Sequence, residues 1–281
     1  MKKYFSLIKF SHTIFAMPFA LIGFFLATNQ YNFEWKIFLY ITMCMIFARS
    51  AAMGFNRYID RDIDKKNKRT SDIREIPNGT ILPQNALIFV IINSLLFVTT
   101  TYLINILCFI LSPVALFIIL GYSYTKRFTA LCHLILGIGI ALAPLGSYLA
   151  IANEFNLLPI LFSFAVFFWV SGFDIIYSLQ DQEFDKNEGL YSIPVSLGKK
   201  KALQISKFLH IASIVVLAII GLIAEFAKWY WIGFSIFSIL LFYQHTLIKH
   251  YNLSKINLAF FTTNGIASII FGTFVILELI L

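Results

Sequence analysis

Long apolar runs, separated by short polar segments, make up most of this chain. A run of about 17–25 apolar residues is long enough to cross a bilayer as a helix. Only a short turn at 105–107 separates the third run from the fourth, which is also the shortest. We expect a single all-α domain over 1–281, a polytopic membrane bundle of nine transmembrane helices. Their predicted bounds are about 11–29, 36–55, 85–105, 108–122, 131–151, 157–178, 204–224, 229–247 and 257–279.

The composition excludes an ordinary soluble domain. Hydrophobic residues make up 59% of the chain and charged residues 13%, whereas soluble domains carry roughly 25% charged residues. The net charge of +8 is not accompanied by an aromatic–basic motif of the kind that binds RNA or DNA. The cysteines Cys44, Cys108 and Cys132 lie in apolar runs without metal-like spacing, and we interpret them as packing residues.

The positions of the basic residues predict how the chain lies in the membrane. With the N-terminus and its Lys2 and Lys3 placed in the cytoplasm, the outer loops contain only Lys36 and Lys228. Arg49 lies inside a predicted span, and the other basic residues fall on the inner side. An excess of Lys and Arg in cytoplasmic loops is the usual topology of membrane proteins. We therefore expect a multi-pass protein of the inner membrane, with its site toward the cytoplasm.

Two acidic stretches lie where an apolar run meets a charged inner loop. The first reads N-R-Y-I-D-R-D-I-D and places Asn56, Asp60 and Asp64 at i, i+4 and i+8. Residues at this spacing stack on one face of a helix. The second reads D-I-I-Y-S-L-Q-D-Q-E-F-D and has the same property. Its residues on the shared face are Asp174, Tyr177, Asp181 and Asp185.

These two faces predict a site for a metal–diphosphate complex. Carboxylates at the edge of a membrane are costly and usually functional, and several of them repel one another unless a cation lies between them. Oxygen ligands without nearby His or Cys favour Mg²⁺, which binds few carboxylates together with phosphate oxygens. Arginine and lysine can bind the remaining phosphate oxygens. The basic residues near the first face or at the end of the fourth span are Arg57, Arg61, Lys65, Lys66, Lys68, Arg69, Arg74, Lys126 and Arg127.

The apolar spans are expected to enclose a cavity lined by Phe, Tyr and Trp, which would suit a long allylic chain and stabilise a cation. Several single residues keep two interpretations. Arg49 is either part of a structural ion pair or a substrate contact, and Tyr177 is either an interfacial aromatic or, with Asp174, a group that orients a substrate. Asp62 points away from the acidic face and is expected to pair with a neighbouring Arg. His133 is expected to be a packed polar residue and not an acid–base group.

These motifs resemble those of the UbiA superfamily of membrane prenyltransferases. The pattern N-R-x-x-D-R-x-x-D is similar to the first Asp-rich motif of that superfamily, and D-I-I-Y-S-L-Q-D-Q-E-F-D-K-N-E-G-L-Y-S-I-P is similar to the second. The segment Y-S-Y-T-K-R-F-T at 122–129 resembles its Tyr-x-x-x-Lys-Arg-x-Thr segment. K-F-S-H-T-I-F-A-M-P-F-A and H-L-I-L-G-I-G-I-A-L-A-P-L-G are similar to the branch that prenylates 4-hydroxybenzoate or related acids. The resemblance covers essentially the whole chain, and it implies a nine-helix bundle.

The resemblance also implies roles for the site residues. One Mg²⁺ would be bound by Asn56, Asp60 and Asp64, and a second by Asp181 and Asp185. The four aspartates would be catalytic together with Arg127. Lys126 and Arg127 would contact the diphosphate or the acidic group of the acceptor, and Arg69 and Arg74 would close a cytoplasmic cap over the site. Apart from the resemblance, we predict further substrate contacts at Asn56, Arg57, Asp174 and Tyr177.

Two cytoplasmic cap loops are expected, at about 56–84 and 180–203. The superfamily usually has two residues between Arg-Thr and the next Arg in the first cap. Here three residues, at 71–73, separate Thr70 from Arg74.

The resulting hypothesis is Mg²⁺-dependent transfer of a polyprenyl group from polyprenyl diphosphate to an aromatic acid, 4-hydroxybenzoate or similar, in ubiquinone or menaquinone biosynthesis. A naphthoate on a menaquinone route is the alternative acceptor. A cation transporter with a carboxylate relay is the alternative of another class, and it predicts acids near the membrane midplane. A non-catalytic lipid-binding scaffold leaves the repeated acid spacing unexplained.

Overall fold

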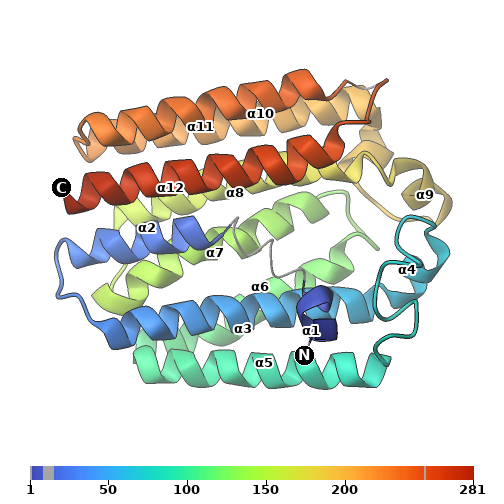
Figure 1. Ribbon diagram of the computed structural model, residues 1–281, viewed down its shortest axis with the longest axis horizontal. Helices are drawn as coiled ribbons and strands as arrows, with labels where there is room; N and C mark the ends of the chain where they lie inside the picture. The colour runs from blue at the N-terminus through green and yellow to red at the C-terminus, as the bar shows by residue number, and fades with distance from the viewer. Residues whose placement is uncertain (1, 9–15, 250) are drawn as a thin grey trace.

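A computed structural model describes residues 2–8, 16–249 and 251–281, and the elements in these ranges are all helices (Figure 1). Seven helices are long and apolar enough to cross a membrane. The last of them begins as the π-helix η2 and continues as α12. The seven are α3 (Trp35–Ile59), α5 (Pro83–Ile104), α6 (Ile106–Thr125), α7 (Cys132–Ala152), α8 (Leu157–Ser178), α10 (Ile193–Ile223) and η2 (Leu258–Thr263) with α12 (Asn264–Ile280).

The structure supports an all-helical membrane protein but does not confirm nine spans. The predicted segment 11–29 corresponds to α2 (Met17–Thr28), which has 12 residues, and residues 11–15 lie outside the described part of the chain. The segment 229–247 corresponds to α11 (Lys228–Leu247), which has 20 residues. Its Trp, Tyr, Gln and His side chains lower its mean hydropathy, and it is not among the seven apolar helices.

Three short helices were not expected from the apolar pattern. They are α1 (Lys2–Leu7), α4 (Arg61–Lys66) and α9 (Gln182–Asn187). The helix α10 also begins eleven residues before its predicted start at 204, because Ser192 caps it by accepting a hydrogen bond from the Val195 N–H at 3.3 Å. Gly198 then interrupts the helical backbone with φ of 79°, a conformation that glycine adopts without strain.

One half of the bundle contains the main hydrophobic core. Trp169 of α8 is fully buried there, and its Nε1 donates a hydrogen bond to Asn264 Oδ1 at 2.9 Å. Its ring lies 5.2 Å from that of Phe19 in α2 and 5.7 Å from that of Phe237 in α11. This core therefore fixes α2, α8, α11 and α12 relative to one another.

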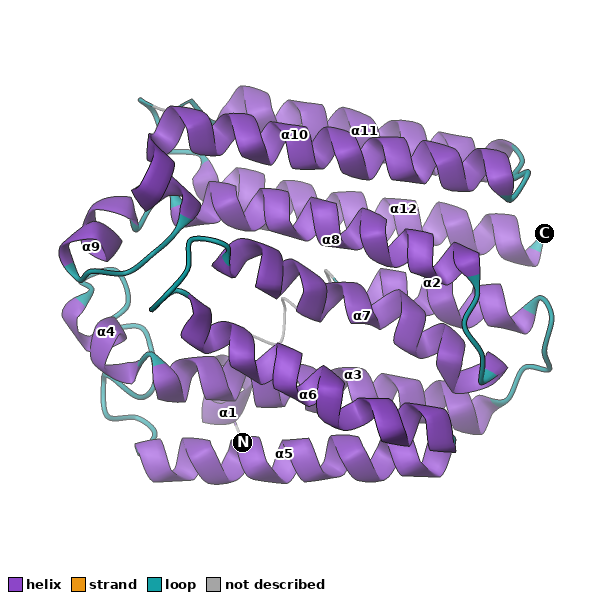
Figure 2. Ribbon diagram, turned by 180° about the vertical axis from the view of Figure 1, so that it is seen from behind, coloured by secondary structure: helices purple, strands orange, loops and turns teal. Residues whose placement is uncertain are grey.

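The long helices lie side by side, and α4 and α9 lie together at one end of the bundle in both views (Figures 1 and 2). Each of these short helices carries part of one acidic stretch. The fold thus places both stretches at the same end. This agrees with the expectation that the two acidic stretches lie together.

Small residues allow close helix contacts in membrane bundles, and Gly23 of α2 is such a contact. A Cβ at this position would collide with the backbone carbonyl of Pro144 in α7. We expect Gly23→Ala to lower the free energy of unfolding by about 1–3 kcal/mol, the usual cost of overpacking. Gly121→Ala in α6 is the matched control, because its Cβ would meet no atom within 4 Å. Thermal unfolding in detergent checks both, and equal melting temperatures would contradict this packing.

Candidate functional site

The two acidic stretches have the same backbone geometry. Asp60 links α3 to α4 with φ −88° and ψ 3°, and Asp181, which follows the turn at 179–180 after α8, precedes α9 with φ −99° and ψ 3°. Four residues later, the N–H of Asp64 bonds to Asp60 O and that of Asp185 to Asp181 O, both at 2.7 Å. The helix that carries the predicted face is therefore interrupted within each stretch. Each is a long helix, an aspartate hinge and a six-residue helix.

Asp60 is buried and holds two cations. Its Oδ2 lies 2.6 Å from Lys126 Nζ, and its Oδ1 lies 3.0 Å from Arg127 Nη2. Asn56 Nδ2 donates to Asp60 Oδ2 at 3.2 Å. Arg127 also donates to the carbonyl of Ile59 at 3.0 Å. The end of α6 is thereby attached to the hinge of the first acidic stretch.

Asp64 is also buried, and it forms an ion pair with Arg74. Thr70 Oγ1 donates to the Asp64 carbonyl at 2.9 Å, and the Arg74 N–H donates to the Thr70 carbonyl at 2.9 Å. The extra residue between Thr70 and Arg74 therefore does not prevent this arginine from reaching the acidic stretch. Arg57 lies buried on α3, and its Nη1 is 3.4 Å from Asn56 Oδ1.

The loop after the first stretch reaches the second one. Arg69 Nε donates to Asp181 Oδ1 at 2.9 Å, and Asn67 Nδ2 donates to the same oxygen at 3.1 Å. Arg69 Nη1 also donates to the Tyr177 hydroxyl at 3.2 Å. Lys66 and Glu188 form an ion pair at 2.6 Å. The two acidic stretches are thus brought together, as expected. Asn67 was not foreseen, since nothing in the sequence marks it apart from its place after Asp64.

A segment between the two stretches connects them further. The Tyr191 N–H, beyond α9, donates to the Lys126 carbonyl at 2.7 Å. Burial and the neighbouring Asp181 carboxylate raise the pKa of Asp185 to about 6. Burial is the larger of the two causes, because it penalises the charged carboxylate, and a bound cation would stabilise that charged form.

Asp174 lies seven residues before Asp181, and its partner is a histidine and not a lysine or an arginine. Its Oδ2 is 2.7 Å from Nδ1 of His133, at the start of α7. The interpretation of His133 as a residue with only a packing role is incomplete, because its ring holds a predicted site residue. The two are 41 positions apart, so sequence spacing gave no sign of the pair.

The residues present fit Mg²⁺ by their chemistry. The predicted ligands Asn56, Asp60, Asp64, Asp181 and Asp185 offer oxygen atoms only, as a hard cation requires. Among the described residues no three His, Cys, Asp or Glu side chains form a ready metal site, since Asp60, Asp64 and Asp181 are paired with basic side chains. Such sparse carboxylates match a metal that arrives together with phosphate oxygens.

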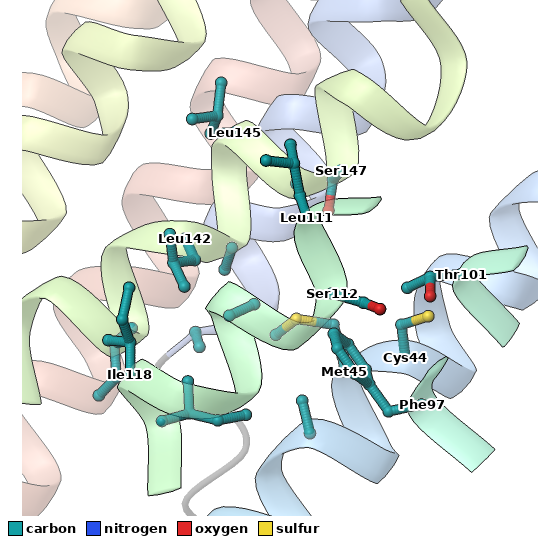
Figure 3. A pocket seen from close by; sticks show the side chains of 18 of the residues that line it. Cys44, Met45, Phe97, Thr101, Leu111, Ser112, Ile118, Leu142, Leu145 and Ser147 are labelled. Carbon is teal, nitrogen blue, oxygen red and sulfur yellow. The ribbon is translucent and has the colours of Figure 1, made fainter. Parts of the chain in front are cut away.

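An apolar cavity of about 360 Å³ lies between α3, α5, α6 and α7 (Figure 3). It extends from Ile41 and Ala150 to Met53 and Tyr122, near the acidic end. The prediction of a lining of Phe, Tyr and Trp is wrong. Most of the lining side chains are aliphatic or small, and the aromatic ones are Phe97, Tyr122 and Phe155. The bundle places most of its aromatic rings in the core around α8 instead.

Arg49 is the charged residue that lines this cavity. Its Nε is buried and has no hydrogen-bond partner among the described residues. No carboxylate in residues 2–8, 16–249 or 251–281 lies within ion-pair distance of it. The alternative of a structural ion pair is therefore not supported. Asp62 does face Arg61, at 3.8 Å, as predicted.

The comparisons with known sequences agree with the motifs. The sequence model of the UbiA prenyltransferase family matches residues 16–266. A 4-hydroxybenzoate octaprenyltransferase of Thiobacillus denitrificans is 29% identical over 243 residues, covering 86% of this chain and 82% of that protein. A 4-hydroxybenzoate octaprenyltransferase of Francisella tularensis subsp. novicida is 30% identical over 230 residues, covering 82% of this chain and 80% of that protein.

Solved structures with the same fold are also known. The apo structure of a UbiA homolog from Aeropyrum pernix K1 has a TM-score of 0.86 and 30% identity, covering 95% of this chain and 98% of that chain. A UbiA homolog from Archaeoglobus fulgidus bound to GPP and Mg²⁺ has a TM-score of 0.75 and 22% identity, covering 99% of this chain and all of that chain. The second likeness shows the shared fold alone.

The contacts of Arg69 predict that it fastens the first cap loop to the second acidic stretch. Arg69→Gln leaves the Asp181 carboxylate without its cation, and we expect faster hydrogen exchange over residues 67–82. Arg61→Gln is the control, because its carboxylate partner Asp62 is 82% exposed. Hydrogen-exchange mass spectrometry compares the two variants. Unchanged exchange in Arg69→Gln would show that other contacts hold the loop.

Proposed function

Because this chain belongs to the UbiA prenyltransferase family, we propose that it transfers a polyprenyl group from polyprenyl diphosphate to an aromatic acid. 4-Hydroxybenzoate is the first candidate acceptor, and respiratory quinone biosynthesis is the route that would use the product. The names of the relatives support this acceptor, and the GPP and Mg²⁺ bound to the Archaeoglobus fulgidus homolog support the donor and the metal. The observation that carries the proposal is the convergence of two Asp-rich stretches and four basic side chains above an apolar cavity.

The ion pairs of the site suggest how the donor binds. Lys126, Arg127, Arg69 and Arg74 now hold the carboxylates of Asp60, Asp181 and Asp64. When the donor enters, these cations exchange partners and bind the diphosphate oxygens, for which bidentate arginine is well suited. Arg57 is proposed as a further substrate contact beside them. The list of proposed Mg²⁺ ligands is Asn56, Asp60, Asp64, Asp181 and Asp185.

The reaction breaks the allylic C–O bond, and the diphosphate leaves with the electron pair. A ring carbon of the acceptor forms the new C–C bond, and the ring then loses its proton. Bound Mg²⁺ would neutralise part of the charge that grows on the leaving oxygens. Fixed Lys126 and Arg127 act on the same charge. The cap loop held by Arg69 excludes water, which would otherwise capture the allylic cation.

The cavity is proposed to hold the prenyl chain, because its aliphatic lining begins directly below the acidic end. Arg49 is proposed to bind the carboxylate of the aromatic acid, as the one charged side chain of the cavity lining in the described residues. A naphthoate also carries this carboxylate and remains the alternative acceptor. The acids at one end of the bundle favour this chemistry over a midplane carboxylate relay. We place that end on the cytoplasmic side of the inner membrane, because the basic loops lie there.

The aspartate hinges are expected to be essential. Asp60→Ala and Asp181→Ala should each abolish Mg²⁺-dependent formation of prenylated 4-hydroxybenzoate, because each removes a proposed metal ligand. Asp62→Ala is the matched control, an exposed carboxylate in the same stretch, and should keep most activity. Mass spectrometry of products from membranes gives the readout, with gel filtration to confirm folding. Full activity in both hinge variants would falsify the proposal. Supplying naphthoates in parallel identifies the preferred acceptor.

Arg49→Met tests the acceptor site separately. Loss of a charge-assisted contact worth about 1.5–3 kcal/mol should raise the KM for the aromatic acid roughly 10- to 100-fold. The KM for the prenyl diphosphate should stay near its wild-type value, because its diphosphate binds at the aspartate hinges. Steady-state kinetics, with each substrate varied in turn, measures the two KM values separately. An equal rise in both KM values would speak against a contact specific to the acid.

A further inference from the structure

The pair formed by His133 and Asp174 is not used in the mechanism above. Asp174 Oδ2 and His133 Nδ1 are 2.7 Å apart. The two residues come from neighbouring helices, α7 and α8, at the end of the bundle that carries the aspartate hinges. Such a short contact between an imidazole and a carboxylate is a strong, charge-assisted hydrogen bond.

The exposure of the two side chains shows which of them can meet a substrate. The Asp174 side chain is 22% exposed, whereas that of His133 is only 4% exposed. Asp174 is therefore the member that can meet a substrate, and His133 lies behind it. In many enzyme sites a buried side chain likewise holds a more exposed side chain in the orientation that the substrate requires.

The contact assigns a hydrogen to Nδ1 of His133. An ionised Asp174 carboxylate only accepts hydrogen bonds, so the ring nitrogen that faces it is the donor. The other ring nitrogen, Nε2, is buried without a nitrogen or oxygen partner among the described residues.

The groups around Asp174 match the two ends of a hydroxylated aromatic acid. Tyr122 and Arg49 both line the cavity and are near each other, and Asp174 is near enough to Tyr122 for their charges to interact, as are Arg57 and Asp60. A guanidinium and an acceptor-only carboxylate therefore both lie close to this tyrosine. The carboxylate of the aromatic acid suits Arg49, and its hydroxyl suits Asp174.

We propose that His133 is a positioning residue, which donates Nδ1–H to Asp174 and fixes that carboxylate to accept a hydrogen bond from the acceptor's hydroxyl group. The inference rests on the proposed function, because it needs a hydroxylated aromatic acceptor. It adds a residue outside the Asp-rich and basic motifs to the site, and it explains why a buried imidazole lies at the start of α7. It also means that the hydrogen bond from the hydroxyl to Asp174 depends on His133, a side chain that does not touch the substrate.

The test uses the full-length protein in membranes with 4-hydroxybenzoate, geranyl diphosphate and Mg²⁺. His133→Leu removes the donor and should lower kcat/KM for 4-hydroxybenzoate about 10- to 100-fold, the order for a misplaced group, with the donor KM unchanged. His133→Asn keeps an N–H at the Nδ1 position and should recover most of the loss. The inhibition constant of benzoate, which lacks the hydroxyl, should not change. His210→Leu is the control, a second buried histidine that bonds to α8 through the Trp169 carbonyl.

A double-mutant cycle with Asp174→Asn completes the test. If His133 acts through Asp174, adding His133→Leu to Asp174→Asn costs little more than Asp174→Asn alone. Additive losses, an equal effect on benzoate, or failure of His133→Asn to recover activity would each overturn the inference while leaving the proposed function intact. A wild-type protein that prenylates no aromatic acid under these conditions would overturn both.

Discussion

The pairing of buried carboxylates with basic side chains is the constraint on which this structure depends. Asp60 and Asp64 lie at the end of a membrane bundle with almost no exposure, where an unpaired charge would be very costly. Their cations come from other segments, since Lys126 and Arg127 follow α6 and Arg74 lies in the cap loop. Satisfying the charges therefore requires α3, α6 and the cap to meet. The geometry of the site is a direct consequence of that requirement.

The two halves of the bundle differ in their packing. The aromatic core around Trp169 packs α2, α8, α11 and α12 together, and the buried hydrogen bond from Trp169 to Asn264 ties α8 to the last helix. The other half, between α3 and α7, keeps an aliphatic cavity that reaches the acidic end. The half with the aromatic core thus carries the second aspartate hinge, and the cavity in the other half is the proposed place of the prenyl chain.

The sequence predicted the features that depend on local spacing and failed where distant segments decide. The all-helical membrane class, the family and the placement of both acidic stretches at one end followed from periodicity and motifs. The break at each hinge did not, because a 3.6-residue pattern continues unchanged through Asp60 and Asp181. The partner of Asp174 could not be found, since His133 lies on another helix.

The aromatic lining was predicted wrongly, because composition counts rings without saying which face of a helix they occupy. The count of nine spans depended on α2, which has only 12 residues in the structure, and on α11, whose polar side chains lower its mean hydropathy.

The ion pairs of the caps also bear on how a catalytic cycle would end. Arg69, Arg74 and Lys126 already have carboxylate partners within the chain, so any anion they bind must compete with those partners. If the site acts as proposed, the same contacts would re-form when pyrophosphate departs, and the restored pairs would weaken its retention. Turnover would then not be held back by a strongly bound polyanion.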